Sequence, residues 1–109
     1  MQKIDGKTIY LTKGDTFKAT ISIKDANGDE YVPEAEDVIR FAMKTNYSDN
    51  WVLIEKVIPH DTMLLQLNPE DTKDLDVRKY VYDVQITFAN GDVDTFIDRA
   101  VLVLTEEVN

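Results

Sequence analysis

The sequence predicts an all-β fold, because Asn-Gly pairs and alternating apolar residues dominate it. Asn-Gly pairs at 27–28 and 90–91 favour tight turns between antiparallel strands, since both residue types tolerate a positive φ. Alternation at every second residue is typical of a strand with one buried face. Such short runs recur about every ten residues, and no long amphipathic helix separates them. We therefore expect a single domain over residues 1–109, an antiparallel β-sandwich of about eight strands.

Composition excludes several function classes. Twelve basic against twenty-one acidic side chains give a net charge of -9, which repels nucleic acid and anionic membrane surfaces at long range. The absence of cysteine excludes disulfides and thiolate sites, and no cofactor is expected. The N-terminus has no apolar stretch of the kind found in signal peptides, and no run is long enough to span a bilayer. We expect neither secretion by a signal peptide nor a membrane partner.

The first half of the chain predicts five strands. After a loose lead-in over residues 1–6, strands are expected at 7–12, 16–24, 30–32, 38–45 and 51–58. The Asn27-Gly28 pair predicts a hairpin in which Ile23 faces Val32, and Pro33 ends that pairing. The acidic stretch around Gly28 also suggests a calcium loop. Its glycine is fourth rather than sixth, however, so we favour a turn.

A short helix is expected near residues 69–75, after a strand at 61–67. Asn68 suits a helix cap, Pro69 suits the first helical position, and the carboxylates that follow complement the helix dipole. One or two helical turns are therefore predicted between the strands of the sandwich.

The Asn90-Gly91 pair joins two runs that predict the central hairpin. A two-residue turn would place Phe88 opposite Val93, and Asp83 opposite Asp98. The second pair brings like charges together, so a bulge or a three-residue turn is an open alternative. Beyond it, residues 99–105 are apolar on both faces, as in a strand packed inside a sheet or covered by a loop.

The run from Asp76 to Tyr82 resembles the segment that leads into strand F of immunoglobulin-like domains. There a tyrosine two residues before a core position anchors the corner, and Tyr80 holds that place here, while Tyr82 replaces the usual cysteine. The alternative is that Tyr80 is an ordinary strand residue with its hydroxyl at the rim. Within the all-β class we therefore expect an immunoglobulin-like sandwich.

Several segments are similar to the N-terminal domain of phage baseplate upper proteins and to small prophage proteins of Gram-positive hosts. They are residues 13–17, 25–28, 31, 33 and 38–44, followed by 61–65, 68–72 and 80–84. The resemblance implies a virion structural protein, an immunoglobulin-like module that docks onto a tail or baseplate protein. It also implies a location in the virion, or in the host cytoplasm during assembly, and it leaves self-association open. Receptor recognition is not implied, because the chain stops at Asn109 before the receptor-binding region of the larger members.

No residue pattern predicts a catalytic or metal site. His60 is the only histidine, and no serine, cysteine or second histidine lies near it in sequence to form a relay. Asp92 and Asp94, with Asp98, offer carboxylates for a cation or for paired acids, but a solvated face that discourages sheet pairing is favoured. A metal-dependent hydrolase using these groups is the weakest hypothesis.

Three aromatic residues are candidate interface residues. In the two-residue register Phe96 faces outward between Asp94 and Asp98, and the alternative is that another segment covers it. Tyr47 and Trp51 flank a polar loop and suit a partner or a sugar, although large aromatics in sandwiches usually pack between the sheets, which favours a core position for Trp51. A small carbohydrate-binding module using Tyr47 and Trp51 is the alternative to a docking module.

Overall fold

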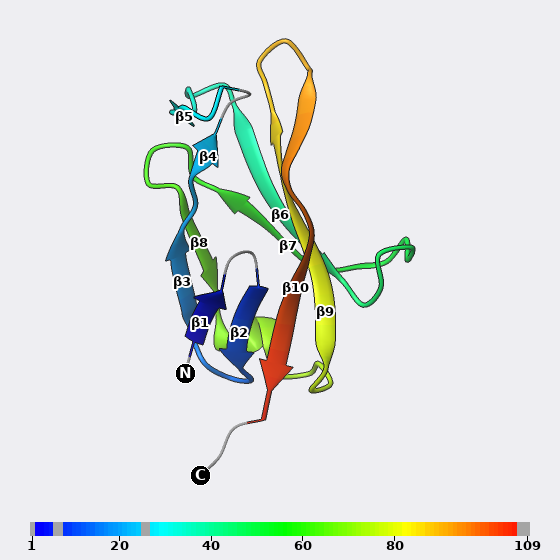
Figure 1. Ribbon diagram of the computed structural model, residues 1–109. Coiled ribbons are helices and arrows are strands. Elements are labelled where there is room, and N and C mark those ends of the chain that lie inside the picture. Colours follow the sequence, from blue (N-terminus) through cyan, green and yellow to red (C-terminus); the bar gives the residue numbers. More distant parts are fainter. Residues whose placement is uncertain (1, 6–7, 25–26, 107–109) are drawn as a thin grey trace.

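The computed structural model, shown in Figure 1, describes residues 2–5, 8–24 and 27–106 and confirms the all-β class. Within these residues there are ten strands and one short helix. In chain order the strands are β1 Gln2–Asp5, β2 Thr8–Thr12, β3 Phe17–Thr20, β4 Ile23–Lys24, β5 Glu30–Tyr31, β6 Val38–Lys44, β7 Val52–Ile58, β8 Leu64–Leu67, β9 Lys79–Thr87 and β10 Val93–Thr105, and helix α1, Pro69–Thr72, lies between β8 and β9.

The largest element is a six-stranded sheet in the order β1-β2-β10-β9-β6-β7. It curls into a half-barrel along the long strands β9 and β10 (Figure 1). Strand β10 pairs in antiparallel fashion with β9 but in parallel with β2, so the expectation of a wholly antiparallel sheet is wrong at this pair. Strand β10 lies between β9 and β2, with Ala100, Leu102 and Leu104 buried on its core face and Val101 and Val103 half-buried on the other face.

Two small sheets, β3-β8 and β4-β5, complete the fold. The main sheet and the small sheets enclose a single core of buried apolar side chains. Its largest fully buried members are Phe17, Phe41, Ile9, Leu11, Ile39, Met43, Ile58, Leu65, Leu67, Ile86, Leu102 and Leu104. The immunoglobulin-like sandwich is not confirmed as such, because within the described residues the strands outside the six-stranded sheet form only these two-stranded pieces.

The β9–β10 hairpin adopts the three-residue turn, the alternative to the two-residue turn. The amide of Gly91 donates to the Phe88 carbonyl oxygen at 2.9 Å, and the amide of Phe88 donates to the Asp92 carbonyl oxygen at 2.8 Å. Gly91 has φ +92°, the left-handed conformation that this turn needs. Thr87 therefore faces Val93, one residue away from the expected register.

Two bulges in β10 then change its register with β9. A register shift between Thr95 and Ile97 returns Ile97 to Val84, the partner that the two-residue turn predicts. A second shift between Ile97 and Ala100 leaves Asp98 and Arg99 in a bulge. Each bulge adds one unpaired residue to β10. The extra residue shifts the alternation of side chains between the two faces of the sheet and changes the direction in which the neighbouring side chains point.

The N-terminal half differs from expectation in three places. Residues 2–5 form strand β1 rather than a loose lead-in. The expected strand 16–24 is divided into β3 and β4, and between them the amide of Ile21 donates to the Met63 carbonyl oxygen at 2.8 Å, next to the Thr20–Leu64 pair. Ile23 pairs with Tyr31 rather than Val32, so the loop at Asn27-Gly28 is longer than a two-residue turn, and its residues 25–26 lie outside the described part.

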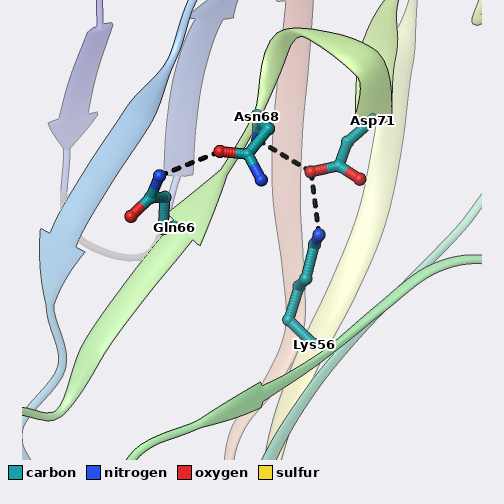
Figure 2. A network of polar contacts seen from close by, with 4 residues as sticks. All are labelled: Lys56, Gln66, Asn68 and Asp71. Atoms are coloured by element: carbon teal, nitrogen blue, oxygen red, sulfur yellow. Dashed lines mark hydrogen bonds and ion pairs between the residues drawn. The ribbon is translucent and has the colours of Figure 1, made fainter.

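Helix α1 begins as expected and links the two layers (Figure 2). The backbone amide of Asn68 donates to Asp71 Oδ2 at 2.7 Å, while Asn68 Oδ1 accepts from Gln66 Nε2 at 2.8 Å. Lys56 Nζ of β7 lies 3.0 Å from the same Asp71 oxygen. The helix therefore joins the end of β8 to the edge strand of the main sheet.

None of the helices in the described residues is long and apolar enough to cross a membrane.

Candidate functional site: the outer face of the sheet and a hollow beside Tyr47

The outward face of the main sheet carries an apolar stripe. On β9 and β10 the core-facing residues are buried, and the residues between them, Val81, Val101 and Val103, are half-buried. Val101 lies opposite Val81, and Val103 lies opposite Tyr10 of β2, which is 38% exposed. A row of partly exposed apolar side chains on three adjacent strands is a surface that another molecule can cover.

A hollow of about 130 Å³ adjoins this stripe. Its lining comes from β6, β9 and the loop between β6 and β7: Ala42, Lys44, Tyr47, Val81, Tyr82 and Asp83. That loop, residues 45–51, projects away from the rest of the chain, as the right-hand side of Figure 1 shows. The sheet and the loop therefore meet at the hollow.

Tyr47 is held at the rim by two residues of the second β10 bulge. Its hydroxyl donates to Asp98 Oδ1 at 2.8 Å, and the Arg99 guanidinium carbon lies 4.6 Å from the ring centroid. Arg99 has φ +53°, a left-handed conformation that costs energy in a residue other than glycine. Backbone strain of this kind often accompanies a functional arrangement, and here the bulge aims both charged side chains at Tyr47.

Asp83 and Lys44 bring opposite charges to the hollow without forming a contact pair. Burial raises the pKa of the Asp83 carboxyl, the charge of Lys44 lowers it, and the charge of Asp98 raises it again. Asp83 and Asp98, the like charges expected to face each other across the hairpin, are therefore close enough for Asp98 to raise the pKa of Asp83. In the described part of the chain neither Asp83 nor Lys44 makes a side-chain hydrogen bond or a close ion pair, so both present free hydrogen-bonding capacity.

Two of the three aromatic candidates differ from expectation. Trp51 is 76% exposed, so the favoured core position is wrong. Phe96 lies at the first β10 bulge, is half-buried and packs against the core, so it is not the exposed anchor that the two-residue register predicts. Tyr47, 46% exposed, keeps its place beside the hollow.

A second hollow, of about 230 Å³, lies between β4, β5 and the turn that connects β7 to β8. His60 and Asp61 line it together with Tyr31 and Met63. Nearby, the Tyr31 hydroxyl donates to Asp37 Oδ2 at 2.6 Å, which raises the pKa of Tyr31 to about 12 and lowers that of Asp37. These polar groups satisfy each other and anchor the loop before β6.

The acidic side chains of the described residues do not gather into a metal site. Within the described residues no cluster of three or more His, Cys, Asp or Glu side chains has the geometry to hold a metal ion. The amide of Asp92 donates to Asn90 Oδ1 at 2.9 Å, and Asn90 Nδ2 donates to Asp92 Oδ2 at 3.2 Å, which places Asp92 in the hairpin turn.

Sequence reasoning missed Lys44, Asp83 and Arg99 as members of one site. A partial signal was present, because alternation places Lys44 and Asp83 on the outward faces of their strands. What was missing is the adjacency of β6 and β9, which pairs Lys44 with Val81 and Ala42 with Asp83.

Comparisons with known proteins found no family model and no curated protein that matches the chain.

Proposed function

We propose that this chain is a non-catalytic docking module of a phage or prophage particle, which acts by protein contact at the tail or baseplate. The observation that carries the proposal is the partly exposed apolar stripe formed by Tyr10, Val81, Val101 and Val103 on the outward face of the main sheet. Half-buried apolar side chains on a sheet are already ordered before a partner binds. Docking on them therefore loses little side-chain conformational entropy.

The strand arrangement supports an immunoglobulin-like module. If β9 is strand F, the order β10-β9-β6-β7 corresponds to G-F-C-C′, and the β3-β8 pair corresponds to B-E. The Tyr80 hydroxyl donates to the Asp76 carbonyl oxygen at 2.6 Å, the bond expected of a tyrosine corner at the start of strand F. The resemblance to baseplate proteins rests on segments that supply these same strands and turns.

The test is coexpression with the tail proteins encoded beside this chain in its own genome. We expect one of them to coelute with the chain on size exclusion, and Val101→Glu and Tyr10→Glu to abolish the complex. Val32→Glu is the matched control, because Val32 is 74% exposed and lies outside the stripe. Circular dichroism establishes that each variant is folded. No complex with any neighbouring tail protein, or a complex that survives both stripe variants, contradicts the proposal.

Carbohydrate binding is the second candidate, favoured by the 76% exposure of Trp51 on the same projecting loop as Tyr47. Exposed aromatic rings present flat apolar surfaces to the C–H faces of sugars. If Trp51 serves this role, soluble oligosaccharides will shift its fluorescence, and Trp51→Ala will abolish binding to a glycan array on which the unmodified chain binds.

A further inference from the structure

The hollow beside Tyr47 combines three features that the docking proposal does not use. Asp83, whose carboxylate accepts hydrogen bonds, and Lys44, whose ammonium group donates them, both line the same small space. An aromatic ring, that of Tyr47, forms part of its wall. Because Asp83 and Lys44 lie on adjacent strands of one sheet, the backbone ladder rather than a loop fixes the positions from which their side chains start.

The charges define what fits between them. Asp83 accepts hydrogen bonds only, and Lys44 donates only, so a ligand that bridges them must offer a donor and an acceptor side by side. A pair of neighbouring hydroxyl groups does both, since each hydroxyl can donate or accept. Lys44 and Arg99 are cationic and Asp83 and Asp98 are anionic, so both signs of charge are present around the hollow and a neutral ligand suits it.

Tyr47 provides an apolar surface that is fixed in advance. Its hydroxyl bond to Asp98 and the stacking of Arg99 hold the ring in place before any ligand arrives. Val81 and Ala42 supply an apolar floor. A hollow of about 130 Å³ is below the range of drug-sized pockets, roughly 300–1,000 Å³, and suits one ring rather than a chain of them.

We propose that this hollow binds a single pyranose unit, with adjacent hydroxyls between Asp83 and Lys44 and the C–H face of the sugar against Tyr47. The site gives the carbohydrate alternative a defined position away from Trp51. The two sites share Val81, but the sugar site does not rest on the docking proposal, because Asp83, Lys44 and Tyr47 take no part in the stripe.

The test is an NMR titration of the ¹⁵N-labelled chain with glucose, galactose, mannose and N-acetylglucosamine, added separately. We expect saturable shifts at the amides of Lys44, Tyr47 and Asp83 with at least one sugar. Lys44→Met and Asp83→Leu should each weaken binding about tenfold or more, because the first removes the charged donor and the second removes the charged acceptor. Lys73→Met is the control, since Lys73 is exposed at the end of α1 and should not alter binding.

Three outcomes overturn the inference. The first is no saturable shift with any of the four sugars, and the second is a shift confined to the amides around Trp51. The third is stronger binding of the zwitterion glycine betaine than of any sugar, which would mean that the two charges select charged ligands. Tyr10→Glu separates the two proposals, because it should abolish docking and leave the sugar-induced shifts unchanged.

Discussion

The hydroxyl of Tyr80 donates a 2.6 Å hydrogen bond to the carbonyl oxygen of Asp76, four residues earlier in the chain. Tyr80 is only 3% exposed, so its ring belongs to the core while its hydroxyl reaches the loop that precedes β9. Burial is the main reason that the pKa of Tyr80 is raised. The bond therefore fixes the point at which the chain leaves α1 and enters the main sheet.

Tyr80→Phe is expected to lower the free energy of unfolding by about 1 kcal/mol, because it removes one partly buried hydrogen bond and keeps the ring. For a domain of this size the melting temperature should fall by about 4–8 °C. Urea unfolding of both proteins measures the difference. Tyr10→Phe is the matched control, since Tyr10 is 38% exposed, and it should change stability little. Equal effects of the two variants would contradict a structural role for the Tyr80 hydroxyl.

The bond from Tyr31 to Asp37 predicts a pH dependence at both ends of the scale. It is the largest cause of the lowered pKa of Asp37, whose ordinary value is 3.8, and of the rise in the pKa of Tyr31 from 10.0 to about 12. A lowered acid pKa stabilises the fold above pH 3.8, and this contribution is lost as the pH falls through the lower, folded-state value. A raised tyrosine pKa stabilises below pH 10, and this contribution is lost as the pH rises toward about 12.

Tyr31→Phe should therefore destabilise the chain most near neutral pH and progressively less toward both extremes. The measurement is the difference in unfolding free energy between the original chain and the variant, determined by urea titration at a series of pH values. Taking the difference removes the titration of all other groups. A difference that stays constant from neutral pH to below pH 3.8 would show that the bond to Asp37 contributes no linked stability.

Lys56 lies on the edge strand β7 with its ammonium group directed toward α1, 3.0 Å from Asp71 (Figure 2). The two side chains are 29% and 21% exposed, so the pair is only partly screened by solvent. Lys56→Met should cost about 1 kcal/mol or less at low salt, and the cost should fall as ionic strength rises. Lys73→Met, at an exposed position, serves as the control in the same urea titrations. A loss that does not depend on salt would mean that packing, not charge, supplies the stabilisation.

Local patterns predicted the strands well and their partners poorly. Alternation located β6, β8 and β9 to within a few residues, since burial of one face imposes a period of two wherever those strands pair. The parallel pairing of β10 with β2 joins the two ends of the chain, and no local rule specifies such a contact. The site was missed for the same reason, because Lys44, Asp83 and Arg99 become neighbours only through strand order and a bulge in β10.

Trp51 tests whether the projecting loop lies as described, because it is the only tryptophan in the chain. At 76% exposure its emission should be typical of a ring in water, and a neutral quencher such as acrylamide should reach it readily. Trp51→Phe should change the free energy of unfolding by less than about 0.5 kcal/mol, the usual range for surface substitutions. Burial of Trp51 between the sheets would give the opposite results. Its emission would be blue-shifted and protected from the quencher, and Trp51→Phe would lower the free energy of unfolding by several kcal/mol, since replacing a large core aromatic leaves a cavity. An exposed Trp51 and a Trp51 buried between the sheets differ in both the emission spectrum and the effect of substitution on stability. The fluorescence and unfolding measurements together therefore decide between the two placements.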